Sequence, residues 1–172
     1  MLRKNWLQTT RLLFQILLSC LLGSFVFLTL SSLSLPLSIV ANPFISAFIH
    51  VDFQHILLNF LILGFVLAQG INRSIGFRDF YNTSFILSLL YFPFSFLHIL
   101  PPCIGLSGVA YYLLTRYLWT RHAIWKAAAA LLFFGEISQI SPSSDTAHLM
   151  HVFGMLMGYR SCAQLMLSKS GG

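Results

Sequence analysis

Long apolar stretches follow one another along the whole chain and restrict the folds that it can adopt. Most of them approach the roughly 20 residues that a helix needs to cross a bilayer. Short segments rich in Pro, Asn and Ser separate them, as turns do. The pattern predicts an all-α membrane protein with six transmembrane helices, of which the fourth is short. The predicted spans are 12–33, 53–70, 80–99, 107–119, 122–140 and 147–167.

The scarcity of charge supports a membrane location. Of the 172 residues, 57% are hydrophobic and 8% are charged, whereas a soluble domain has roughly a quarter of its residues charged. The formal net charge is +6, but the basic residues occur singly or in pairs and form no stripe, so we expect no nucleic-acid partner. Cys20, Cys103 and Cys162 lie far apart, without metal or redox spacing, and are expected to act as small apolar residues.

The basic residues predict the orientation. All of them fall on one side of the predicted topology, and Asp52, Glu136 and Asp145 fall on the other. Because cytoplasmic loops carry an excess of Lys and Arg, we expect both termini in the cytoplasm, in a protein of the bacterial inner (plasma) membrane. The first apolar run exceeds the roughly 7 to 15 residues of a cleavable signal core and should persist as a span. The expected domains are a cytoplasmic segment at 1–11, a membrane domain at 12–168 and a cytoplasmic tail at 169–172.

Polar residues within the predicted spans are informative because lipid disfavours them. His55 and Asn59 are four residues apart, and His148 and His151 are three apart, so each pair shares one helix face. Ser107 begins the short fourth span. That span is roughly 20 Å long against about 30 Å of hydrocarbon, which places Ser107 about 10 Å below the outer surface. His151 and Asn59 should lie about 9 and 10 Å below the same surface. The sequence therefore predicts a polar cluster open to water from outside.

These residue types permit acyl-transfer chemistry. A serine hydroxyl becomes a nucleophile when a neutral imidazole takes its proton, which suits Ser107 with His151 as the base. Attack on a carbonyl creates an oxyanion that needs donors, and we expect the Ser107 amide and the side chains of His55 and Asn59 in that role. No carboxylate is close enough in the sequence pattern to complete a triad. Tyr111, one turn after Ser107, is instead expected to stack on the His151 ring and orient it.

Three motifs together resemble those of the rhomboid family of intramembrane serine proteases. A GxSG motif opens the fourth span, an HxxxxHxxxN pattern lies in the second span, and an HxxGxxxG pattern lies in the sixth span. The similarity is clearest over about residues 40 to 165. In chain order the matching residues are His50, His55, Asn59, Gly105, Ser107, Gly108, His151, Gly154 and Gly158.

The resemblance implies a bundle of six transmembrane helices that is rhomboid-like, with a short central fourth helix. It also implies an enzyme without a cofactor or a metal. It implies that Ser107 and His151 form the catalytic dyad, with Tyr111 beneath the base. Gly154 and Gly158 would form a seam of small residues where helices pack closely. The implied substrates are transmembrane proteins in the lipid bilayer, cut near their extracytoplasmic ends. The sequence contains no feature that sets an oligomeric state.

Two departures from the family pattern stand out. Met150 precedes His151, where the family usually has a small residue. The loop between the first two spans lacks the family's Trp-Arg motif, so the resemblance does not extend to the lateral entrance for substrate.

Other interpretations remain beside this one. A non-catalytic relative could hold membrane clients without cutting them, although such proteins usually lose the serine or the histidine. Ser107 could simply bond to a carbonyl one turn earlier, and Glu136 is expected to form a hydrogen bond rather than to act in catalysis. A metal transporter or metalloenzyme could use His50, His55, His148 and His151, but no HExxH motif and no carboxylate at ligand spacing accompanies them. Soluble serine hydrolases are excluded because their GxSxG motif would need glycine where this chain has valine.

Overall fold

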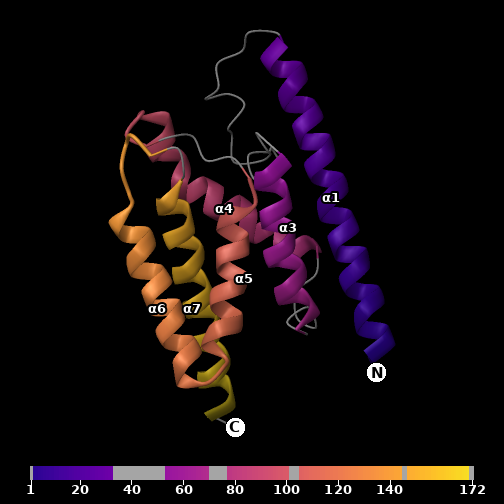
Figure 1. Ribbon diagram of the computed structural model, residues 1–172, viewed down its shortest axis with the longest axis vertical. Helices are drawn as coiled ribbons and strands as arrows, with labels where there is room; N and C mark the ends of the chain where they lie inside the picture. The colour runs from indigo at the N-terminus through magenta and orange to yellow at the C-terminus, as the bar shows by residue number, and fades with distance from the viewer. Residues whose placement is uncertain (1, 33–52, 70–76, 101–104, 145–146, 171–172) are drawn as a thin grey trace.

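Six helices make up the described part of the chain. The computed structural model describes residues 2–32, 53–69, 77–100, 105–144 and 147–170 (Figure 1), and these ranges contain no strand. The helices are α1 (Leu2–Ser32), α3 (Phe53–Ala68), α4 (Phe77–Phe96), α5 (Ser107–Trp119), α6 (Ala123–Ser138) and α7 (His148–Ser170). The all-α prediction is therefore confirmed, and each predicted span coincides with one of these helices.

The helix bounds differ most from the prediction at the start of α1, and by at most three residues at every other helix end. α1 begins at Leu2, ten residues before the predicted span, because the segment before the apolar run contains no Gly or Pro and is rich in good helix formers. Hydropathy marks the part of a helix that suits lipid, not the point where the helix begins. α4 ends at Phe96 rather than at residue 99, because His98 adopts a left-handed φ of 55° that a right-handed helix cannot contain.

α5 is the central helix and packs against α3, α4, α6 and α7. α1 lies at one edge of the molecule, against α3, and α6 lies at the opposite edge (Figure 1). The start of α1 and the end of α7 lie at the same end of the molecule (Figure 1). The fully buried side chains of the core include Leu63, Leu87, Leu106 and Leu113, so α5 shares its core with its neighbours on several sides.

Glycines let α5 and α7 pack backbone against backbone. A Cβ added at Gly154 would clash with the main-chain carbonyl of Gly108, and one added at Gly158 would stand 2.5 Å from the Tyr112 carbonyl oxygen. From the first contact to the second, the position increases by four residues on each helix. The two helices therefore run parallel, and successive turns of α7 contact successive turns of α5. Gly108 also leaves space for Met150, whose Cγ would lie 2.7 Å from an added Cβ. The larger residue before His151 is thus accommodated by a glycine on α5.

The exterior of the described helices is apolar. Many large hydrophobic side chains are exposed, whereas a soluble monomer exposes only scattered ones. By length and hydropathy, one helix in the described ranges is a candidate membrane span, Leu7–Val26 within α1, and Ile56–Ala68 in α3 is a shorter apolar segment. The exposed apolar residues include Leu7, Phe14, Leu21, Leu58, Phe65, Leu131 and Phe134.

Candidate active site

Ser107 is the first residue of α5 and is 9% exposed. The chain approaches it through Gly105, whose φ of 110° disfavours any residue with a side chain. The first amides of a helix have no acceptor within the helix, and here the first bond of α5 runs from the Ala110 amide to the Leu106 carbonyl at 2.9 Å. The Ser107 amide is therefore a donor that stands beside its own hydroxyl.

The glycine contacts between α5 and α7 determine which residues meet Ser107. His151 precedes Gly154 by one helical turn, so the matched register brings it to the first turn of α5. It is 6% exposed. Its ring lies parallel to the Tyr111 ring, with a centroid separation of 4.2 Å and an interplanar angle of 6°. One face of the imidazole is thus covered by an aromatic ring from the helix that carries the serine.

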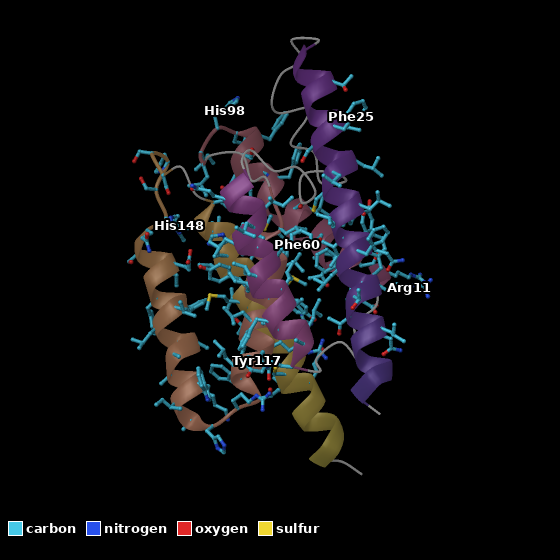
Figure 2. The ribbon with its side chains drawn as sticks, turned by 45° about the vertical axis from the view of Figure 1, so that its right-hand side comes forward. Arg11, Phe25, Phe60, His98, Tyr117 and His148 are labelled. Atoms are coloured by element: carbon cyan, nitrogen blue, oxygen red, sulfur yellow. The ribbon has the colours of Figure 1, made fainter. Side chains whose placement is uncertain are left out.

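A carboxylate from a third helix contacts the same imidazole. Glu136, two residues before the end of α6, is 7% exposed. Its Oε2 lies 2.8 Å from Nδ1 of His151 and 2.7 Å from Nδ1 of His148. Its Oε1 accepts a hydrogen bond from the Tyr111 hydroxyl at 2.6 Å. Figure 2 shows His148 beside the end of α6, far from Tyr117 at the other end of the molecule.

This cluster corrects the expectation that no carboxylate approaches the histidines. Glu136 forms hydrogen bonds, as expected, but one of them is to the candidate base itself. A sequence signal existed, because a lone acidic residue within an apolar span is costly in lipid and marks a functional hypothesis by default. The partner of Glu136 could not be read from the sequence, because it depends on how α6 is rotated against α7, which no local pattern determines.

Ser107 and His151 are close in register but are not joined directly. Within the described ranges the structure records no hydrogen bond between the Ser107 hydroxyl and the His151 ring. The Nδ1 atom of His151 is engaged by Glu136, which leaves Nε2 as the ring atom available to the serine. Catalytic hydrogen bonds are often long or poorly aligned before substrate binds, so the lack of this hydrogen bond is compatible with a base and its nucleophile.

α3 contributes a polar group that has no acceptor. Asn59 is 3% exposed, and its Nδ2 is buried without a hydrogen-bond partner in the described structure. α3 packs against α5, the helix that begins at Ser107. The side chain of His55 and the whole of His50 lie outside the described residues, so the structure places neither of them.

The same cluster contains the described residues that could hold a metal ion. Ligand atoms of Glu136, His148 and His151 lie within 4.8 Å of one another, so the sequence argument that the histidines lack a carboxylate neighbour is wrong. Two ligands of a tetrahedral zinc stand about 3.3 Å apart, given bond lengths of about 2.0–2.1 Å. The two Nδ1–Oε2 distances of 2.7 and 2.8 Å are shorter, and they are typical of hydrogen bonds. The geometry favours a hydrogen-bonded cluster.

Comparison with known proteins identifies one relationship. A family model described as a Rhomboid domain matches residues 37–168. This range includes α3 to α6, most of α7 and every candidate site residue. Neither among curated proteins nor among solved structures is there a significant match.

Proposed function

The chain belongs to the rhomboid family and is therefore an integral membrane protein, and from this premise we propose that it is an intramembrane serine endopeptidase. Its substrates are transmembrane proteins, which it cuts near the extracytoplasmic side of the bilayer. The described helices act as six spans, with both termini in the cytoplasm. The common end of α1 and α7 supports the placement of both termini on one side (Figure 1).

The observation that carries this proposal is the environment of His151. A buried imidazole is held between the Tyr111 ring and the Glu136 carboxylate, at the level where α5 presents Ser107. An imidazole that only filled space would not need a stacking partner on one face and an acceptor at its edge. A base that must take and return a proton needs a fixed orientation.

The reaction follows from these positions. The Ser107 oxygen attacks the carbonyl carbon of the scissile peptide while Nε2 of His151 takes the hydroxyl proton. The tetrahedral intermediate collapses, and His151 returns this proton to the leaving amine. Water then attacks the acyl-serine ester, with His151 again taking and returning one proton. The products are two peptide segments and the regenerated serine.

Donors for the oxyanion come from two helices. The Ser107 amide at the start of α5 has no acceptor within its helix. The unpaired Nδ2 of Asn59 supports its assignment as a second donor, because a buried donor without an acceptor gains one only when substrate brings an oxyanion. His55, one turn earlier on α3, is proposed as a third donor.

A second candidate function is a rhomboid-like protein that binds membrane clients without cutting them. The absence of a direct hydrogen bond between Ser107 and His151 in the described structure favours it. A client-holding protein would have no use for the unpaired donor on Asn59 or for the precise clamp on His151, so we rank it second.

The test compares cleavage of a transmembrane substrate by wild type, Ser107→Ala and His151→Ala in proteoliposomes. Both variants should lose cleavage entirely while keeping the wild-type melting temperature within a few degrees. Ser107 should also react with a fluorophosphonate probe in wild type and not in Ser107→Ala. Wild-type rates in the serine variant would disprove the proposal, and an inactive wild type that still binds the substrate would favour the client-binding function.

The chain offers matched controls for both substitutions. Ser84 on α4 is a buried serine whose hydroxyl donates to the Phe80 carbonyl at 3.0 Å, the ordinary role of a helix serine. His98 is exposed and lies after the end of α4. Ser84→Ala and His98→Ala should retain wild-type cleavage.

A further inference from the structure

We propose that Glu136 positions His151 for catalysis, so that this chain uses a serine, a histidine and a glutamate where the family resemblance implies only the first two. The inference rests on the proposed protease function. Glu136 is a positioning residue, because it touches the base and not the substrate.

The argument begins with what the carboxylate can accept. An ionised carboxylate has no proton to donate and offers about four lone-pair sites. Three groups surround it, the two Nδ1 atoms at Oε2 and the Tyr111 hydroxyl at Oε1. All three are able to donate. The cluster is therefore satisfied when Glu136 is ionised and each neighbour supplies one proton.

This arrangement selects one tautomer of the base. If Nδ1 of His151 donates to Glu136, a neutral ring must leave Nε2 unprotonated. The unprotonated Nε2 is the form that can take the Ser107 proton. When His151 becomes an imidazolium during the reaction, the adjacent carboxylate stabilises its charge, as the third member of a serine-protease triad does.

The neighbours of Glu136 hold it in place. Tyr111 contacts both partners, because its ring stacks on His151 and its hydroxyl bonds to Oε1. His148, one turn before His151 on α7, bonds to the same oxygen as the base. The carboxylate is thus restrained from α5 and from α7 together. A surface carboxylate with a single partner would lack that restraint.

The decisive variant is Glu136→Gln, which keeps the shape and removes the charge. When the NH₂ of the glutamine side chain faces His151, it donates to Nδ1. This contact stabilises the tautomer in which Nε2 carries the proton. Neutralising the corresponding carboxylate of a serine-protease triad costs about 10⁴-fold in kcat, so we expect a loss on the order of 10²-fold or more here. KM should stay within about twofold, because Glu136 does not touch the substrate.

Glu136→Asp and Asp79→Asn complete the set. Glu136→Asp keeps the charge on a shorter side chain and should recover at least tenfold of the activity lost in Glu136→Gln. Asp79 is an exposed carboxylate in the first turn of α4, and Asp79→Asn should cut at the wild-type rate. Near-wild-type kcat in Glu136→Gln, or equal losses in Glu136→Gln and Glu136→Asp, would overturn the proposal. Activity that is lost on chelation and regained with Zn²⁺ would also overturn it, since the cluster would then be a metal site.

A measurement on the wild type keeps the test valid if the variants fail to fold. In protein labelled with ¹⁵N at histidine, the signals that disappear in His151→Ala should show a protonated Nδ1 and an unprotonated Nε2. The opposite tautomer would disprove the inference. The two proposals fail separately: an active Ser107→Ala removes the protease, whereas an active Glu136→Gln beside an inactive Ser107→Ala removes only the role of Glu136.

Discussion

At the scale of single residues, Asn59 is the side chain whose position is hardest to explain by packing alone. Its Nδ2 is buried and unpaired within the described structure, and an unsatisfied buried donor costs about 1–3 kcal/mol. A site that must bind an oxyanion has a use for such a donor. The energetic cost in the free protein is then offset in the transition state.

Asn59→Ala should therefore separate activity from stability. We expect kcat to fall by on the order of 10²-fold, the typical cost of one oxyanion donor. The melting temperature should stay the same or rise, because the substitution removes an unpaired polar group. Measurements of substrate cleavage and of thermal unfolding in the same detergent test this. A lower melting temperature with unchanged kcat would show that the amide is structural.

The residues of the site were predictable to different degrees. The sequence order and the helical rise place Ser107, Asn59 and His151 at one depth, and helix periodicity puts Tyr111 one turn from the serine. The ring stacking of Tyr111 and His151 agrees with that placement. Glu136 was not predicted as their neighbour, because its contacts depend on how α6 rotates against α7, which no local pattern determines.

At the scale of elements, the contact between α5 and α7 sets the position of His151, the proposed base. Glycines at 154 and 158 bring α7 onto the main chain of α5, and small residues of this kind are common where membrane helices approach closely. The HxxGxxxG pattern indicated a seam. It did not indicate the partner helix, since a glycine spacing is the same whichever neighbour it faces.

Gly154→Ala should disrupt this contact and disable the enzyme. The added methyl group would clash with the Gly108 carbonyl, and a backbone atom cannot move aside as a side chain can. We expect a loss of stability of about 1–3 kcal/mol or more, with cleavage lost as His151 shifts from Ser107. Differential scanning calorimetry measures the loss of stability, and the rate of substrate cleavage measures the loss of activity.

Gly64 supplies the control for that substitution. It lies in the middle of α3, and an added Cβ would meet nothing within 4 Å. Gly64→Ala should leave cleavage unchanged and raise stability by up to about 1 kcal/mol, since alanine favours helix over glycine. Equal damage at both positions would mean that helix propensity, and not the contact with α5, explains the effect.

At the scale of the whole molecule, the proposed topology rests on the distribution of charge and on the common end of α1 and α7 (Figure 1). Most basic residues of the described helices lie near the start of α1, the end of α5, the start of α6 or the later part of α7. Hydropathy predicted the approximate bounds of the six helices in the described ranges, because apolar length is a property of each segment alone. The central position of the fourth helix was expected from the family resemblance and agrees with the contacts of α5 with α3, α4, α6 and α7; hydropathy alone could not give it, because it depends on packing between distant segments.

Cysteine labelling tests the orientation. Thr120 precedes α6 and Ser143 follows it, so the two residues lie at opposite ends of this helix. Both are exposed. In a variant without native cysteines, Ser143→Cys should react with an impermeant maleimide on intact cells. Thr120→Cys should react only after the membrane is opened. The reverse pattern would place the candidate site on the cytoplasmic side and contradict the proposed topology.

The backbone contact between α5 and α7 has a consequence for how the protein responds to changes in the surrounding bilayer. Contacts between side chains can rearrange when a bilayer changes in thickness or temperature. The contact between α7 and the main chain of α5 cannot rearrange in this way, because no flexible side chain lies between them. The distance between Ser107 and His151 should therefore be insensitive to lipid composition. α1 packs at the edge of the molecule, and it should respond to the same changes in the bilayer by tilting.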